Sequence, residues 1–216
     1  IYKLTKTEPL GWEAKAHNLT TALGTIADPI DLGMDIGRTR DLSVIWLLRR
    51  GELARFSIAV IAMARMPFRV QRYVLYALLP HVMRSGGRAC IDCNGIGRQL
   101  AEEAADKFGS RVEGVNFTNA NKEALAVGLK DAMEDYGLLI PIDPDVSRSL
   151  HSIQKTKTST GLSRFDAERS DATGHADHFW AAALAVHAGE APSGGLTAGM
   201  IRTGGRRETS DWMDRY

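Results

Sequence analysis

Cysteine, long apolar runs and an excess of either charge are all scarce in this chain. Its two cysteines, Cys90 and Cys93, form one Cys-x-x-Cys pair, whereas a structural zinc site needs two such pairs or added histidines at the right spacing. A redox pair would normally open a helix, so we expect small buried hydrophobes in a reducing cytoplasm. No apolar run reaches the roughly 18 residues that span a bilayer, so no membrane partner is expected. With a net charge of +1, any contact with nucleic acid requires a local basic patch.

The chain does have enough apolar sequence for one main domain. It is 216 residues long and 44% hydrophobic, which suffices for one substantial core. We expect a lead-in or linker segment at residues 1–29, a main domain at 30–188, and a flexible glycine-rich tail at 189–216. Because no leader precedes Ile1, we also expect a processed chain or an excised domain.

Strand and helix signals alternate through the main domain. Strand patterns occupy residues 30–36, 42–49, 53–64, 88–92 and 112–117, and helical spacing follows Pro67 and occupies 97–108 and 119–136. Three tightly linked strands are thus followed by helix, strand, helix, strand and helix, which predicts an α/β fold with a mixed five-stranded sheet flanked by helices. A β-hairpin at 150–168 and an alanine-rich helix at 175–186 are expected after it.

Three aspartates stand at the edges of different apolar segments. Asp35 ends the first strand, Asp92 ends the strand at 88–92, and Asp177 lies in the first turn of the last helix. Placing the first strand, 30–36, at the centre of the sheet beside the fourth, 88–92, brings Asp35 and Asp92 to neighbouring carboxyl ends, where open α/β sheets bind ligands. Any one aspartate alone is typical of a turn or a helix cap, but the three in this order favour a site.

Buried carboxylates are costly unless a positive charge lies among them, and hard divalent cations prefer carboxylate oxygen. Three converging carboxylates can hold two divalent ions roughly 4 Å apart, which suits in-line displacement at phosphorus. Asp35 would bridge both ions, because the central strand is the element near both flanking ligands, and Asp92 and Asp177 would each complete one shell. Asp41 would coordinate through water or lie in an outer position, and His175 would orient a water or contact the scissile phosphate.

Three segments resemble the nuclease domain of the large terminase subunit of tailed phages, of its Mu-like branch. They are Met34-Asp35-Ile36-Gly37, Ile91-Asp92-Cys93-Asn94-Gly95-Ile96-Gly97 and, most specifically, Gly174-His175-Ala176-Asp177-His178-Phe179-Trp180-Ala181-Ala182-Ala183-Leu184-Ala185. The resemblance covers about residues 30–190. It implies an RNase H-like fold and a metal-dependent endonuclease that cuts double-stranded viral DNA during genome packaging in the bacterial cytoplasm.

In that family the acids at the positions of Asp35, Asp92 and Asp177 bind Mg²⁺ or Mn²⁺, and some relatives have glutamate at the second position. The resemblance also implies a packaging ATPase domain, a portal and a small terminase subunit as partners. The Gly-x-x-x-x-Gly-Lys-Ser/Thr loop of such an ATPase is absent from this sequence.

Basic residues near the expected site are the candidates for phosphate contacts, which weaken steeply with salt. One group is on the hairpin, which lies beside the DNA path in the family, and the other is beside the first acid: Lys155, Lys157, Arg164 and Arg169, with Arg38 and Arg40. The alternative for each is an ordinary solvated surface charge.

Other functions fit parts of the same pattern. Asp35-Ile36-Gly37-Arg38-Thr39 also resembles the first phosphate loop of actin-like ATPases and sugar kinases, although those need a second related domain. A non-catalytic RNase H-like module that binds DNA or protein, or a resolvase or transposase of the same fold, is a further alternative.

Overall fold

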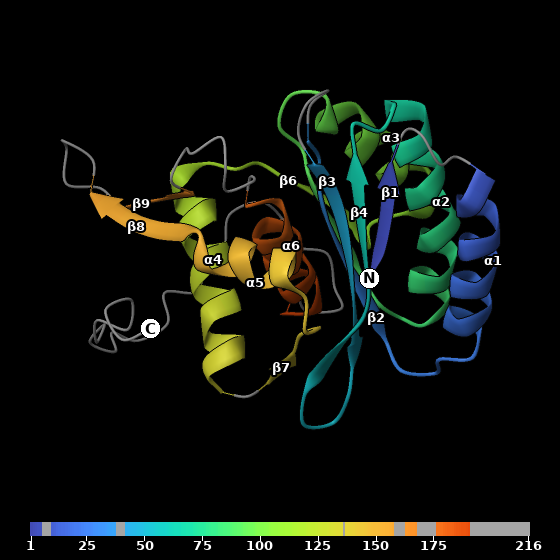
Figure 1. Cartoon of the computed structure of the whole chain (residues 1–216), viewed down its shortest axis with the longest axis horizontal. Coiled ribbons are helices and arrows are strands. Elements are labelled where there is room, and N and C mark those ends of the chain that lie inside the picture. Colours follow the sequence, from blue (N-terminus) through green and yellow to red (C-terminus); the bar gives the residue numbers. More distant parts are fainter. Residues whose placement is uncertain (6–9, 38–41, 136, 158–162, 168–175, 191–216) are drawn as a thin grey trace.

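A computed structural model describes residues 1–5, 10–37, 42–135, 137–157, 163–167 and 176–190 (Figure 1). The strands are β1 (Tyr2–Thr5), β2 (Ile30–Asp35), β3 (Leu42–Arg50), β4 (Arg55–Ala64), β5 (Ala89–Asp92), β6 (Val112–Val115), β7 (Leu138–Leu139), β8 (Ile153–Lys157) and β9 (Ser163–Ala167). The helices are α1 (Leu10–Gly24), α2 (Phe68–Arg84), α3 (Gly97–Phe108), α4 (Asn119–Glu134), α5 (Pro144–His151) and α6 (Asp177–Glu190). Within the described residues, no helix is both long and apolar enough to cross a bilayer.

The main sheet is mixed and has β2 near its centre. Its strand order is β1-β4-β3-β2-β5-β6, with β7 also paired to β4. β3 runs antiparallel to β2 and β4, whereas β5 runs parallel to β2 and β6. The prediction of a mixed sheet with the first strand beside the fourth is confirmed. The number of strands was predicted too low, because the short strands β1 and β7 extend the β4 edge and make the sheet seven-stranded.

Helices cover both faces of this sheet. Figure 1 shows α1, α2 and α3 on one side, and α4, α5 and α6 with the β8–β9 hairpin on the other. Side chains alternate along β2, so that Leu32 and Met34 enter the core on the α2 side while Asp31, Gly33 and Asp35 face α6. The face of the sheet that carries the acids is therefore the one that α6 covers.

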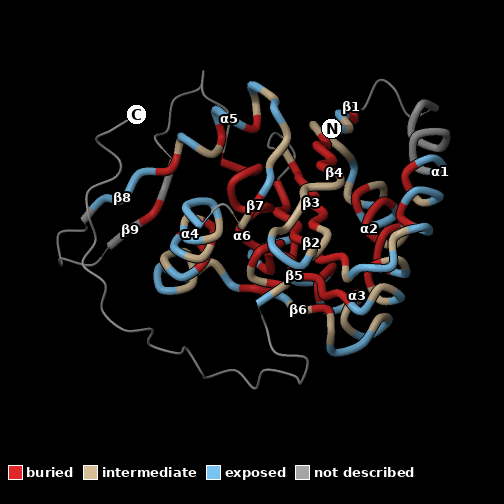
Figure 2. The backbone as a smooth tube through the Cα atoms, turned by 90° about the horizontal axis from the view of Figure 1, so that it is seen from below, coloured by how far each residue is buried: buried red, intermediate tan, exposed pale blue. Residues whose placement is uncertain are grey.

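Helix α6 is buried along nearly its whole length, as its red colour in Figure 2 shows. A helix that is apolar all round belongs in a protein interior, and alanine at most of its positions lets the backbone approach the sheet closely. It begins at Asp177 and ends at Glu190, later at both ends than the predicted 175–186. α4 packs on its outer side, with the solvent-facing turns of α4 exposed (Figure 2).

The part of the chain expected as a lead-in segment is more ordered than its weak periodicity indicated. β1 pairs in parallel with the end of β4, and α1 packs on α2 through Leu19 and Leu23. Contacts with distant elements, which no local pattern reveals, stabilise both. The proposed domain boundaries stay a prediction, and residues 191–216 of the expected tail lie outside the described residues.

Helix α5 was not predicted, although the sequence contains its start signal. Asp143 caps it by accepting hydrogen bonds from the backbone N–H groups of Asp145 and Val146, and Pro144 occupies the first turn. Because α5 continues to His151, the first hairpin strand begins at Ile153 and not at residue 150.

Candidate metal centre

Three buried aspartates meet where β2, β5 and α6 come together. Asp35 ends β2, Asp92 ends the parallel neighbour β5, and Asp177 begins α6. Their exposed fractions are 7%, 6% and 8%. α6 runs opposite to β2, since its last turn lies near Asp31 and its first residue near Asp35. Residues far apart in sequence thus form one acidic cluster.

The three carboxylates perturb one another. Burial raises the pKa of Asp35 well above its ordinary range, and the negative charges of Asp177 and Asp92 raise it further. Burial also raises the pKa of Asp92 to about 6, against the opposing effect of hydrogen bonds from Asn94. A cluster of this kind favours either protonation or a bound cation.

The turn after β5 fixes the orientation of Asp92. The backbone N–H and the side-chain amide of Asn94 both donate to Asp92 Oδ1, at 2.9 and 2.7 Å. Gly95 follows with φ of +60°, a conformation that favours glycine. The Asp-Cys-Asn-Gly sequence therefore ends the strand and holds its last carboxylate in place.

The first turn of α6 is fixed by α5. Ser149 Oγ accepts a hydrogen bond of 3.2 Å from the backbone N–H of Phe179, one of the N–H groups that a helix start leaves without a partner. α5 is itself held to the sheet edge, because Lys3 of β1 forms ion pairs with Asp145 and Asp143. The position of Asp177 thus depends on elements at both ends of the described chain.

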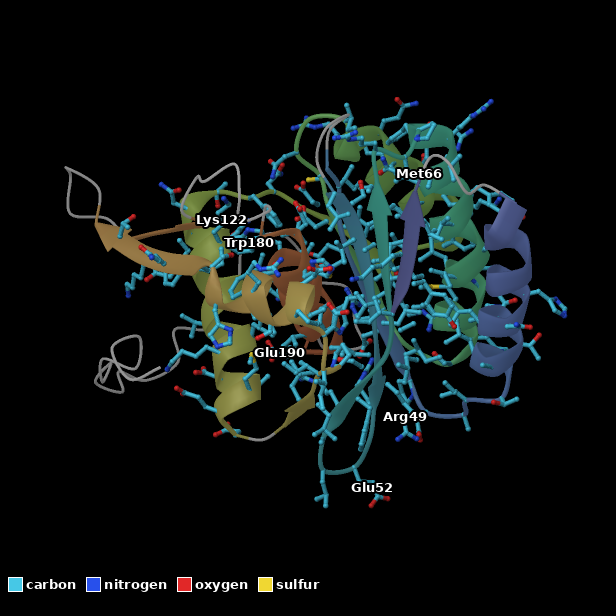
Figure 3. All side chains as sticks on the ribbon, in the orientation of Figure 1. Arg49, Glu52, Met66, Lys122, Trp180 and Glu190 are labelled. Carbon is cyan, nitrogen blue, oxygen red and sulfur yellow. The ribbon has the colours of Figure 1, made fainter. Side chains whose placement is uncertain are left out.

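Lys122 is a basic residue at the centre that the sequence motifs did not reveal. It lies on α4, with Nζ 5.0 Å from the ring centroid of Trp180 and 5.9 Å from that of Phe117. Figure 3 shows Lys122 and Trp180 side by side between α4 and α6. Its positive charge lowers the pKa of both Asp35 and Asp92. An ordinary helical lysine carries no sequence signal, and only the packing of α4 on α6 brings it to the acids.

A fourth buried acid on the same face has a permanent partner. Asp31 is fully buried and accepts two hydrogen bonds from Arg50, at 2.6 Å from Nε and 2.9 Å from Nη2. It also accepts one of 3.1 Å from the backbone N–H of Arg88. This bidentate pair is a structural ion pair, and no sequence motif marks it.

The remaining predicted site residues are placed only in part. Asp41, His175, Arg38, Arg40 and Arg169 lie outside the described residues. Lys157 ends β8 and Arg164 lies on β9, where its backbone pairs with Thr156. Lys155 is half-exposed, with Nζ 3.5 Å from Glu123 of α4 and over the ring of Phe165. The hairpin therefore packs beside α4, and its role stays a prediction.

The fold and its acidic cluster define an RNase H-like domain. The chain belongs to the family described as the terminase RNaseH-like domain, which matches residues 32–188. The predicted family and fold class are confirmed, and the family match favours this assignment over an actin-like ATPase. Its placement in the Mu-like branch stays a prediction.

Solved structures with the same fold come from several phages. The large terminase nuclease of thermophilic phage G20c with bound magnesium is 22% identical, with a TM-score of 0.61 over 74% of this chain and 80% of that one. The nuclease domain of Thermus phage P74-26 is 21% identical, with a TM-score of 0.59 over 78% and 84%. The nuclease domain of bacteriophage SPP1 with bound manganese is 14% identical, with a TM-score of 0.50 over 77% and 89%. None of the curated proteins matches the chain in sequence.

Proposed function

We propose that this chain is the endonuclease domain of a phage DNA-packaging terminase and that it cuts double-stranded DNA by hydrolysis of phosphodiester bonds. The observation that carries the proposal is the convergence of Asp35, Asp92 and Asp177, all buried, at the carboxyl edge of the sheet. Membership of the terminase RNaseH-like family supports it, as does the binding of magnesium or manganese in two proteins of the same fold.

The residues present fit a divalent metal site. Three carboxylates supply only oxygen ligands, which Mg²⁺ and Mn²⁺ prefer, and their mutual repulsion disfavours the same cluster without a cation. Asp35 would hold both ions of a pair, with Asp92 and Asp177 completing one shell each. Such ions supply an activated water as nucleophile and stabilise the leaving oxygen.

The protein's own groups would orient the phosphodiester. Lys122 places a positive charge next to the carboxylates, where it attracts a phosphate approaching the edge of the sheet. The ring of Trp180 limits the positions that its side chain adopts. Asp41 and His175 are proposed to support the ions and the attacking water, as their sequence positions indicate.

The DNA itself would be held mainly through its phosphates. The proposed contacts are the basic residues of the hairpin and of the segment after β2: Lys155, Lys157, Arg164, Arg169, Arg38 and Arg40. A packaging ATPase domain, a portal and a small terminase subunit, acting in the cytoplasm of a bacterial host, are the proposed partners and location.

The test is cleavage of supercoiled plasmid by the purified chain with Mn²⁺ or Mg²⁺. Wild type should nick and cut with little sequence preference, and Asp35→Asn should abolish cutting because it removes charge at the centre of the cluster. Asp106→Asn, the same change on an exposed residue of α3, is the matched control and should cut normally. Equal cutting by wild type and Asp35→Asn, with both folded by circular dichroism, would refute the proposal.

A further inference from the structure

A second group of metal-ligating side chains lies on the same face of the sheet, apart from the aspartates. Cys90 Sγ, a carboxylate oxygen of Glu113 and a ring nitrogen of His187 all lie within 4.8 Å of one another. The three residues come from β5, β6 and α6. We propose that they form a second metal site, selective for a borderline-soft divalent ion such as Zn²⁺.

The register of the sheet explains why these side chains meet. Cys90 and Glu113 are direct partners on the parallel strands β5 and β6, so both point to the same face. α6 covers that face, and His187 lies in its last turn. His187 lies ten positions after Asp177 on this helix, which is roughly 15 Å at a rise of about 1.5 Å per residue. The two groups of ligands share no residue, and they come closest on β5, where Cys90 lies two residues before Asp92.

The ligand types differ from those of the acidic cluster. Thiolate sulfur and imidazole nitrogen favour Zn²⁺ over Mg²⁺, and three protein ligands leave a fourth tetrahedral position for water. Binding releases the thiol proton of Cys90 to solvent and forms the metal–sulfur bond without any redox change. Cys90 is fully buried, whereas the Glu113 side chain is 34% exposed, so the group extends from the core to the surface.

The charges around the group are balanced. Arg88 lies 3.6 Å from the Glu113 carboxylate and would orient it as an outer partner. Its positive charge opposes a cation, while the carboxylate of Glu113 favours one; the charge of Asp31 is already paired with Arg50. The thiolate formed on binding adds a further negative charge. An ion held here would tie the end of α6 to β5 and β6. Of these elements, α6 carries Asp177 and β5 carries Asp92.

Cobalt titration of the metal-free chain tests this site, because thiolate bound to Co²⁺ gives a charge-transfer band in the near ultraviolet that oxygen ligands do not give. Wild type should show the band, saturating at one thiolate-bound ion per chain, and excess Zn²⁺ should remove it. Cys90→Ala should abolish it. His187→Gln, a change at a partly exposed residue, should weaken Co²⁺ binding by more than the ~10–100-fold that loss of an outer-shell partner costs.

Two controls separate this site from the acidic cluster. Cys93→Ala removes the other cysteine, which lies next to Asp92, and should keep the band. Asp35→Asn should also keep it, so the proposal stands or falls independently of the nuclease assignment. Absence of the band in wild type, or a band that survives in Cys90→Ala or has unchanged affinity in His187→Gln, would overturn the second site.

Discussion

The backbone of α6 lies directly on Gly33 of β2: a Cβ atom at Gly33 would stand 2.1 Å from the carbonyl oxygen of Ala181. The same atom would stand 2.3 Å from the backbone nitrogen of Ala185. Both obstacles are helix backbone, which cannot move aside as a flexible side chain does. Glycine at this position therefore sets the distance between α6 and the sheet, and with it the approach of Asp177 to Asp35.

Gly33→Ala should push α6 away from β2. We expect a loss of about 1–3 kcal/mol in the free energy of unfolding, typical of overpacking, together with weaker metal-dependent cutting. Urea denaturation and the plasmid assay measure the two effects. Gly24→Ala, at the end of α1 where an added Cβ meets nothing within 4 Å, is the control and should change neither. A Gly33→Ala protein of wild-type stability would show that the helix position is not set by this contact.

Metal should stabilise the protein more at high pH than at low pH. The folded-state pKa of Asp92 is raised to about 6 from an ordinary value of 3.8. Protonation of Asp92 therefore stabilises the folded state at low pH, and this stabilisation is lost as pH rises through 6. The raised pKa of Asp35 acts in the same direction. The Mg²⁺-induced rise in Tm, measured against EDTA, should therefore be larger at about pH 8 than at about pH 5. Asp92→Asn should reduce this difference, and an equal rise at both pH values would contradict the electrostatic account.

Lys122→Met should reduce cleavage while leaving the fold intact. The change keeps an unbranched chain next to Trp180 but removes the positive charge near Asp35 and Asp92. We expect a loss of roughly 10²-fold in the cleavage rate, the scale of removing one preorganised electrostatic group. Lys130→Met on the same helix removes a lysine that pairs with Glu134 and should cut nearly normally. Similar rates for the two variants would assign Lys122 a packing role only.

The hairpin should contribute to the salt dependence of DNA binding. Lys155→Ala combined with Lys157→Ala should weaken binding to duplexes of any sequence and reduce the slope of log K against log salt by about 2. Lys107→Ala on α3, across the sheet from the hairpin, should leave the slope unchanged. Fluorescence anisotropy across a salt series measures both, and an unaltered slope in the double variant would remove these lysines from the DNA path.

Local patterns were sufficient for the central elements and for the acids. The alternation of β2 and the helical spacing of α3 are short-range features, and α3 spans the predicted residues 97–108. The same patterns could not locate β1 or α1, because packing against distant elements determines their structure. Lys122 and His187 were missed for the same reason, since only the docking of helices brings them to β5. Because Cys90 and His187 are far apart in sequence, the spacing of histidines around the Cys-x-x-Cys pair did not indicate the proposed second site.

The two ends of β2 carry acids whose charges are compensated in different ways. Asp31 pairs with the guanidinium of Arg50, which is part of the chain, whereas the proposed partner of Asp35 is a metal ion that can dissociate. Withdrawal of Mg²⁺ alone, with Zn²⁺ kept at the proposed second site, would therefore loosen the molecule asymmetrically. Amide exchange should accelerate over the first turn of α6 near Asp177, while the last turn near Gly189 stays protected. Local opening would then be confined to the end of the helix that carries the acidic cluster.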